Sequence, residues 1–159
     1  MRVGIGYDSH RFAPGGPMRL GGVSLPIDFQ LVGHSDGDAI AHAVTDALLG
    51  AAGAGDIGEM FSDTDAANRG RDSLEMLRLA VVRVSGLGWR VENIDVTVVA
   101  ERPHIGPYRE QMREALAPAL GIAARDIGIK GKSNERLGWI GRGEGLACIA
   151  VALLVRTGA

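Results

Sequence analysis

A carboxylate and an imidazole stand close together near the end of the first predicted strand. Asp8 and His10 follow residues 3–7, in which apolar side chains alternate with glycines. Side chains two positions apart in a strand project to the same face, so these two groups would point at one place. A lone Asp-x-His is also what the polar end of an ordinary strand looks like, so the pair needs a third partner.

A predicted helix offers that partner. Asp38, His42 and Asp46 are spaced four apart and form one polar stripe on the helix. A solvated face would carry Lys and Glu, whereas short acids and a histidine favour a functional site. If His42 meets Asp8 and His10, the three ligands suit zinc and leave a fourth position open. A non-haem iron site uses the same ligand types, so these residues do not fix the metal.

Two loops carry groups that suit phosphate. Residues 34–37, His-Ser-Asp-Gly, directly precede the helix, where free backbone N–H groups make an anion site; helix capping is the plain alternative. Residues 130–135 combine lysines, a hydroxyl and backbone amides, which are donors for phosphate oxygens. Glu135 could hold a second, harder cation such as Mg2+. This segment lacks the GxxxxGK[ST] spacing, which disfavours a nucleotide triphosphatase.

An acidic stretch, residues 56–65, follows the predicted helix. It could ligate metals or bind sugar hydroxyls. It does not have the twelve-residue EF-hand pattern, so calcium binding of that kind is excluded. Taken alone, the stretch also fits a polar surface loop.

Strands and helices must position these groups. Hydrophobic periodicity and cap residues predict helices that begin at Asp38, at Asp72 or Ser73, and at Pro107, the last one disturbed near its end by Pro118. Because strands and helices do not alternate strictly, the sequence predicts one α+β domain over residues 1–159. The predicted strands are residues 3–7, 19–25 with a bulge at Gly21-Gly22, 89–101, 127–132, and 146–155 as a buried strand.

Composition limits the class of protein. The 159 residues suit one domain, and 46% apolar residues argue against general disorder. A formal net charge of −2 gives no electrostatic footprint for nucleic acid or an anionic membrane. No segment reads as a signal peptide or a membrane span. The single cysteine, Cys148, lies in an apolar run and reads as a buried residue. We expect a soluble, cytoplasmic protein that binds neither nucleic acid nor membrane.

Taken together, these clusters resemble the motifs of the 2-C-methyl-D-erythritol 2,4-cyclodiphosphate synthase family of non-mevalonate isoprenoid biosynthesis. The resemblance covers essentially the whole chain, with the motifs in the family's order and spacing. The matching segments are Gly4-Ile5-Gly6-Tyr7-Asp8-Ser9-His10-Arg11-Phe12; His34-Ser35-Asp36-Gly37-Asp38 with His42 and Asp46-Ala47-Leu48-Leu49-Gly50; Asp56-Ile57-Gly58 with Phe61 and Asp63; and Lys132, Glu135, Leu137-Gly138 and Gly141-Arg142-Gly143-Glu144-Gly145.

The resemblance implies a reaction and an assembly. The substrate would be 4-diphosphocytidyl-2-C-methyl-D-erythritol 2-phosphate, whose 2-phosphate attacks the distal phosphorus of the diphosphate, closes an eight-membered ring and expels CMP. The fold would be a mixed β-sheet covered by helices on one face. Members assemble as homotrimers with their sheets facing the centre and each active site between neighbouring subunits.

The resemblance also implies residue roles. Zinc or another divalent cation would sit on Asp8, His10 and His42, and Glu135 would touch a Mg2+ or Mn2+ ion on the diphosphate. The implied substrate contacts are the transition-state stabilisers His34 and Ser133, together with Asp8, Ser9, His10, Ser35, Asp56, Ile57, Gly58, Phe61, Ser62, Asp63, Thr64, Asp65, Ala100, Pro103, His104, Ile105, Gly106, Lys132, Asn134, Glu135, Trp139 and Arg142.

Some positions depart from the family pattern. Ser133 and Asn134 stand where threonines are common, His104 stands where lysine is expected, and Trp139 replaces a more usual phenylalanine. Arg142 lies in the loop that faces the central cavity of the trimer in the family. There it could contact an isoprenoid diphosphate.

Two other functions fit some of these residues. A zinc phosphohydrolase would share the metal ligands but release phosphate without forming a ring. A non-catalytic, metal-stabilised assembly module is a different class. Structural zinc sites usually close all four positions with protein ligands, whereas three good ligands converge here.

Overall fold

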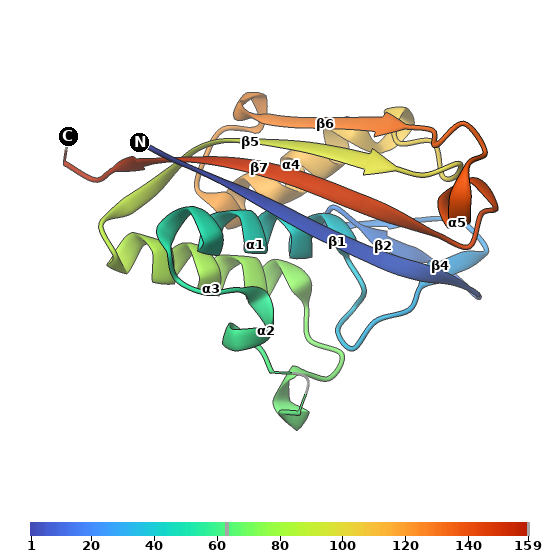
Figure 1. The fold of residues 1–159 in the computed structure, drawn as a ribbon, viewed down its shortest axis with the longest axis horizontal. Helices are drawn as coiled ribbons and strands as arrows, with labels where there is room; N and C mark the ends of the chain where they lie inside the picture. The colour runs from blue at the N-terminus through green and yellow to red at the C-terminus, as the bar shows by residue number, and fades with distance from the viewer. Residues whose placement is uncertain (63, 159) are drawn as a thin grey trace.

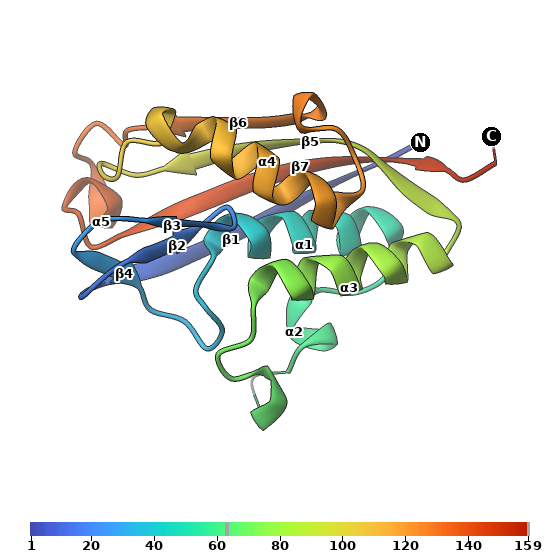
Figure 2. The ribbon, with the colours of Figure 1, turned by 180° about the vertical axis from the view of Figure 1, so that it is seen from behind.

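The computed structural model describes residues 1–62 and 64–158 as one α+β domain, in which helices cover one face of a mixed β-sheet (Figure 1 and Figure 2). The sheet has the strand order β4-β1-β7-β5-β6; the β5–β6 pair is parallel and the other three pairs are antiparallel. This confirms the predicted fold class. The strands are β1 Arg2–Pro14, β4 Phe29–Leu31, β5 Trp89–Val99, β6 Ile127–Lys132 and β7 Gly145–Arg156, and a separate hairpin contains β2 Met18–Leu20 and β3 Val23–Leu25.

Aspartate caps begin the helices nearest the site. Asp38, Asp56 and Asp72 each precede a helix and accept a backbone N–H from its first turn, as Asp commonly does at this position. One helix contains Pro118 and continues to Leu120, so the predicted disturbance by this proline does not interrupt the helix. The helices are α1 Ala39–Ala52, α2 Ile57–Met60, α3 Ser73–Gly86, α4 Arg109–Leu120 and α5 Gly138–Gly141, with 3-10 turns η1 Ala66–Asn68, η2 Gly106–Tyr108 and η3 Ala124–Asp126.

The packing of α1 against β1 depends on two glycines. A Cβ atom at Gly4 would lie 2.0 Å from the carbonyl oxygen of Ala47, and one at Gly6 would lie 1.9 Å from that of Ala43. Real Cβ atoms do not approach backbone so closely, so glycine is required for this separation of strand and helix. On the helix side, the small side chain of Ala51 completes the contact with Gly4.

The opposite face of the sheet is apolar and exposed. Val3, Ile5 and Tyr7 point away from the helices and are 68%, 70% and 57% exposed. On the neighbouring strand β7, Ile149 and Val151 are exposed as well. The prediction of a buried strand over residues 146–155 is therefore wrong at these alternate positions, because the helices cover the other face of the sheet.

Residues 19–25 form a hairpin instead of the predicted bulged strand. Its turn is Gly21-Gly22, with φ values of +60° and +75°, the left-handed conformation that two-residue hairpin turns require. The N–H groups of these glycines donate to the carboxylate of Asp38 at 2.8 and 2.6 Å. A completely buried carboxylate thus fastens the hairpin to the N-terminus of α1.

Two expectations from composition can be compared with the fold. Cys148 is buried, as predicted, and burial raises the pKa of its thiol well above the ordinary value. Within residues 1–62 and 64–158, no helix has both the length and the apolar character needed to cross a membrane.

Because a Cβ atom at Gly6 would meet the backbone of α1 and one at Gly50 would meet nothing, alanine should change the free energy of unfolding in opposite directions at these two positions. Gly6→Ala places a methyl group against the backbone of α1 and should lower the free energy of unfolding by about 3 kcal/mol or more, because backbone cannot move aside easily. Gly50→Ala, on the exposed side of the same helix with nothing within 4 Å, should raise it by about 0.5–1 kcal/mol through helix propensity. Urea unfolding measures both, and similar effects would contradict the contact.

Candidate active site

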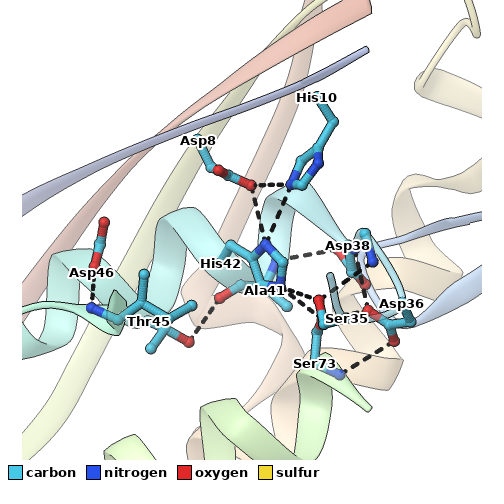
Figure 3. Close-up of polar contacts among 12 residues, drawn as sticks. Asp8, His10, Ser35, Asp36, Asp38, Ala41, His42, Thr45, Asp46 and Ser73 are labelled. Atoms are coloured by element: carbon cyan, nitrogen blue, oxygen red, sulfur yellow. Dashed lines mark hydrogen bonds and ion pairs between the residues drawn. The ribbon is translucent and has the colours of Figure 1, made fainter. Parts of the chain in front are cut away.

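β1 and α1 bring together the three predicted metal ligands (Figure 3). Asp8 and His10 lie on the inner face of β1, and His42 faces them from α1. The Oδ2 atom of Asp8 lies 2.7 Å from Nε2 of His10 and 3.1 Å from Nδ1 of His42, and the two imidazole nitrogens are 3.3 Å apart. These three side chains form a group that could hold a metal ion.

The donor atoms fit a tetrahedral metal site with one position open. Ligands at bond lengths of about 2.0–2.1 Å in a tetrahedral site stand roughly 3.3–3.4 Å from one another. The distances of His42 to Asp8 and His10, 3.1 and 3.3 Å, are close to this, whereas the 2.7 Å between Asp8 and His10 is a hydrogen-bond distance. Nδ1 of His10 lies 2.6 Å from the carbonyl oxygen of Val32. Donation of its proton to that oxygen leaves Nε2 as the ligand atom. Two imidazoles and a carboxylate suit zinc and several other divalent cations.

Without a metal ion, Asp8 and His10 form an ion pair. Burial alone would raise the pKa of Asp8, but hydrogen bonds and charge attraction to His10 and His42 outweigh it and lower the pKa. Burial alone would lower the pKa of His10, but contact with Asp8 and with the Val32 carbonyl group raises it. A metal ion that binds here therefore competes with a proton for Nε2 of His10, and a lower pH opposes its binding.

Hydroxyl groups hold the other side of the His42 ring (Figure 3). Nε2 of His42 lies 2.9 Å from Oγ of both Ser35 and Ser73. The Ser73 hydroxyl donates to the Asp36 carboxylate, which also accepts the Ser73 backbone N–H at 3.1 Å. The sequence indicated Ser73 as a helix cap and Asp36 as part of an anion-binding loop, but connected neither residue with His42.

A cavity of about 330 Å3 opens beside the metal-ligand group. Predicted substrate contacts reach it from two segments, His34 and Ser35 from the loop before α1, and Ile57, Gly58 and Phe61 from the segment around α2. The structure thus brings the predicted anion-binding loop and part of the predicted substrate loop to one place. The lining residues that the sequence did not indicate as substrate contacts are Val32, Gly33, Asn68 and Met76.

The other predicted loop residues that the structure describes, Asp56, Ser62, Thr64 and Asp65, are not on the wall of this cavity. Asp56 caps α2 by accepting the Glu59 N–H at 2.8 Å. Asp65 caps η1 and, with Thr64, lines a smaller cavity of about 120 Å3. The hydroxyls of Ser62 and Thr64 are hydrogen-bonded at 2.8 Å. The predicted contact Asp63 lies outside the described residues.

A separate cavity of about 340 Å3 lies between the loop after β5 and the end of β6. The predicted contacts to the cytidine and its phosphates gather here, with the ammonium group of Lys132 as their positive charge. The predicted residues on its wall are Ala100, Pro103, His104, Ile105, Gly106, Lys132 and Ser133.

Glu101, which the sequence did not indicate, holds the loop that follows β6. Its carboxylate accepts the backbone N–H groups of Asn134 and Arg136 at 3.1 and 3.0 Å. Glu135 and Arg136 have φ values of +51° and +62°, an unfavourable conformation for residues with a Cβ atom. Ser133 donates to Oε1 of Glu135 at 2.8 Å. Two predicted contacts to the substrate diphosphate therefore bind each other in this chain.

The metal-ligand group and the second cavity belong to different strands. Asp8 is opposite Cys148 on β7, Cys148 is opposite Val98 on β5, and Val98 is opposite Gly131 on β6. Three strand spacings of about 4.8 Å therefore separate β1 from β6, roughly 14 Å in all. The two cavities have no lining residue in common.

Three further predicted contacts lie elsewhere. Ser9 and Trp139 line a third cavity, of about 230 Å3, together with Glu144. The Arg142 Nε atom donates to Oε1 of Glu144 at 2.6 Å. Since neighbouring residues of a strand point to opposite faces, Ser9 does not join Asp8 on the wall of the metal cavity.

The three side chains of the polar stripe on α1, Asp38, His42 and Asp46, have different roles. His42 belongs to the metal-ligand group, whereas the buried Asp38 binds the hairpin turn. Asp46 accepts the backbone N–H of Ile57 at 2.8 Å and fastens α2 beside the cavity. The hypothesis of a functional site along the whole stripe is therefore wrong for its two carboxylates, which hold structure around the site.

Known proteins similar to this chain include several named 2-C-methyl-D-erythritol 2,4-cyclodiphosphate synthase. The model of the YgbB family matches residues 1–155. A relative from Gemmatimonas aurantiaca, named 2-C-methyl-D-erythritol 2,4-cyclodiphosphate synthase, is 63% identical over 158 residues, which cover 99% of this chain and 95% of the relative. A protein of the same name from Escherichia coli O6:K15:H31 is 49% identical over 156 residues, 98% of either chain.

Solved structures share the fold over nearly the whole chain. The structure described as bifunctional IspDF from Campylobacter jejuni has a TM-score of 0.94 and 39% identity; the match covers 98% of this chain and 42% of that longer one. The similarity therefore concerns less than half of the bifunctional protein. The structure described as an IspF (Plasmodium falciparum) CDP complex has a TM-score of 0.86 and 32% identity, with 99% of this chain and 97% of the other covered.

The Asp8–His10 ion pair predicts how stability without metal depends on pH. The folded pKa of His10 is raised above 6.5, so the pair stabilises the fold fully below that pH. Its contribution is lost as the pH rises through the higher folded pKa. The pKa of Asp8 is lowered from 3.8, so the contribution is also lost in strong acid, as the pH falls through that lowered value.

Urea unfolding of chelator-treated protein, from about pH 5 to about pH 9, tests this linkage. Asp8→Asn is the comparison, because it removes the charge while the other titrating groups stay the same. The stability advantage of the wild type over the variant should be largest near the acid end and shrink as the pH rises. An advantage that does not change over this range would contradict the ion pair.

Proposed function

The chain belongs to the YgbB family of 2-C-methyl-D-erythritol 2,4-cyclodiphosphate synthases, which are lyases of isoprenoid biosynthesis, and from this premise we propose how its residues carry out the reaction. An oxygen of the 2-phosphate of 4-diphosphocytidyl-2-C-methyl-D-erythritol 2-phosphate attacks the distal phosphorus of the diphosphate. The bond from that phosphorus to the bridging oxygen breaks, and the bridging oxygen leaves with CMP. The nucleophile belongs to the substrate, so the reaction needs no activated serine or cysteine.

One observation carries this proposal: ligand atoms of Asp8, His10 and His42 converge within 3.3 Å of one another beside a cavity of about 330 Å3. A divalent cation held there, which we propose is zinc, supplies positive charge to phosphate oxygens. That charge is needed because attack of one phosphate on another meets strong repulsion. The Val32 carbonyl group beside His10 and the Ser73 hydroxyl beside His42 keep the two imidazoles in the orientation that binding requires.

The other lining residues orient the reacting phosphates and the erythritol chain. His34 and Ser35 place donors at the N-terminal end of α1, where an anion is favoured. In this proposal His34 donates to the oxygen on which charge grows in the transition state. Ile57, Gly58 and Phe61 bound the carbon chain on the side of α2. Holding a flexible chain in ring-closing geometry removes much of the entropic barrier.

The second cavity holds the cytidine and its diphosphate in this proposal. Lys132 contributes a positive charge, and Glu135 would hold a Mg2+ or Mn2+ ion, which would supply further positive charge to the diphosphate. Ser133, which donates to Glu135 in this chain, would offer its hydroxyl to a phosphate oxygen. Solved relatives described as CDP complexes support a cytidine diphosphate ligand. At the position where the family has lysine, His104 offers an imidazole donor.

We propose that each complete site forms between two copies of the chain in a homotrimer. The separation of the metal-binding and nucleotide-binding cavities by β7 and β5 supports this. The exposed apolar row of Val3, Ile5 and Tyr7 supports it as well, because such patches mark protein interfaces. A closed ring would bring the nucleotide cavity of one copy to the metal cavity of the next. The cytoplasmic location stays a prediction.

Phosphorus NMR during turnover tests the reaction itself. With substrate, zinc and magnesium, the protein should produce the cyclic diphosphate and an equal amount of CMP. A chelator and His42→Ala should each abolish both signals, because either removes the metal from its site. Open-chain phosphate products would indicate a zinc phosphohydrolase instead. Unchanged substrate in the presence of metal-loaded protein would favour the non-catalytic assembly module.

Sharing of sites between copies predicts that two inactive variants regain activity when they are mixed. His42→Ala damages the metal half of the site, and Glu135→Ala damages the nucleotide half. In randomly mixed rings about one interface in four joins two intact halves, so about a quarter of the wild-type rate should return after co-expression. Steady-state CMP release measures this rate.

A mixture of His42→Ala with Asp8→Ala is the matched control. Both substitutions damage the same half of the site, so no interface in these rings is complete and the rate should stay at that of the separate variants. Recovery in both mixtures, or in neither, would contradict a site shared in this way.

A further inference from the structure

Both nitrogens of the His42 ring are engaged, and this fixes which one carries the proton. Nδ1 faces Asp8 and His10, so it must present a lone pair to a metal ion. Nε2 must then carry the proton and donate it. Two hydroxyl oxygens, from Ser35 and Ser73, stand at the same distance of 2.9 Å from this nitrogen.

The two hydroxyls are not equivalent, because Asp36 engages one of them. The hydroxyl proton of Ser73 goes to Oδ1 of Asp36, so the Ser73 oxygen can turn only a lone pair toward His42. The Asp36 carboxylate is itself held by the backbone N–H groups of Ser73 and Asp38, at 3.1 and 3.2 Å. Ser73 is 1% exposed. Its hydroxyl therefore has a fixed orientation as an acceptor.

Ser35 is in a different position. It is half-buried and lines the cavity next to the metal-ligand group, which Ser73 does not. Its hydroxyl lies 3.4 Å from Oγ of Ser73 and 3.4 Å from the N–H of Gly37, and both contacts are long for hydrogen bonds. Nothing among these contacts fixes the Ser35 proton, so this hydroxyl can rotate toward a ligand in the cavity.

We propose that Ser73, oriented by Asp36, is the positioning residue that holds His42 in its metal-binding orientation, and that Ser35 is thereby left free for the substrate phosphate (Figure 3). The proposal rests on the metal site of the proposed function and adds to it a chain of contacts from Asp36 through Ser73 to His42. A carboxylate placed behind a ligating histidine makes the imidazole a better ligand. Here a serine transmits that effect.

The same contacts connect the metal ligand with the substrate loop. Asp36 N–H donates to the Arg71 carbonyl group at 3.2 Å, and Gly70 N–H donates to that of His34 at 2.8 Å. The segment from Gly70 to Ser73 therefore lies against the loop before α1. This segment connects the loop that contains Phe61 to the start of α3. Ser73 is the first residue of α3, so the start of this helix fixes the His42 ring.

Zinc affinity, measured by competition with a chromogenic chelator, separates the two serines. Ser73→Ala should weaken zinc binding by about 10–100-fold, the usual loss when the partner of a ligating histidine is removed. Asp36→Asn, which keeps the size but removes the charge, should weaken it in the same direction. Ser35→Ala should change zinc affinity by less than about 3-fold while it lowers kcat/KM for cyclisation. Ser85→Ala, on the exposed side of α3, is the control and should change neither.

Histidine-selective nitrogen NMR of the zinc-loaded protein provides the second readout. His42 should show Nδ1 as the metal-bound nitrogen and a slowly exchanging proton on Nε2 in the wild type and in Ser35→Ala. In Ser73→Ala that proton should exchange rapidly, while thermal unfolding of the metal-free variant stays near that of the wild type. Failure of the wild type to bind zinc would overturn the metal site itself.

With zinc bound to the wild type, two results would overturn the role of Ser73 alone. One is an unchanged zinc affinity in Ser73→Ala. The other is an equal loss of affinity in Ser35→Ala and Ser73→Ala, which would mean that the two hydroxyls support His42 interchangeably.

Discussion

The close backbone contact between β1 and α1 is the constraint on which the site depends. Gly4 meets Ala47 and Ala51, and Gly6 meets Ala43 and Ala47. Each step of two residues along the strand, about 6.7 Å, thus corresponds to a step of four residues along the helix, about 6 Å, in the opposite direction. The next step along the strand is Asp8, and its carboxylate contacts His42, the helix residue next to Ala43. The metal-ligand group therefore depends on the short distance between strand and helix that the glycines allow.

The residues around this contact hold α1 at both ends of the site. The buried Asp38 carboxylate binds the N–H groups of the Gly21-Gly22 turn and of Ala41. Burial raises the pKa of Asp38, and hydrogen bonds from three backbone N–H groups only partly oppose this rise. The buried carboxylate therefore stabilises the fold only while the turn supplies its hydrogen-bond donors. One turn beyond His42, Asp46 fixes the start of α2. Both acids fix backbone segments near His42, and neither lines the cavity.

Much of this arrangement could be predicted from the sequence where its physical causes are local. The start of α1 at Asp38 follows from capping, and the convergence of Asp8 with His10 follows from strand periodicity. The sequence predicts a bulge at Gly21-Gly22 because the apolar residues on both sides fit one bulged strand as well as two short strands. The structure has a hairpin turn there, and its N–H groups bind the carboxylate of Asp38, which is distant in the sequence. The sequence pattern also did not show which face of the sheet the helices cover. Gly4 and Ile5 point to opposite faces, and both residue types are compatible with a strand.

Contacts between distant segments were the part that sequence reasoning missed. Ser73 reads as an ordinary helix cap, and nothing in its own segment points to a histidine 31 positions earlier. Glu101 reads as the polar end of a strand, although its carboxylate binds the N–H groups of Asn134 and Arg136. Such residues act through others, and their neighbours in the sequence do not reveal them. The three residues of the metal-ligand group were easier to predict because their chemistry is unusual at the positions where they occur.

The two faces of β1 would connect the metal-ligand group with the proposed assembly. Gly4, Gly6, Asp8 and His10 face the helices, while Val3, Ile5 and Tyr7 alternate with them on the exposed face. A shift of the strand by one residue would exchange the two rows and lose both the metal-ligand group and the exposed apolar face. The long antiparallel register with β7, from Arg2 opposite Leu154 to Arg11 opposite Gly145, prevents that shift. In the proposed trimer, the register that orients Asp8 toward His42 therefore also builds the surface that brings a second copy, with its nucleotide cavity, to the metal site.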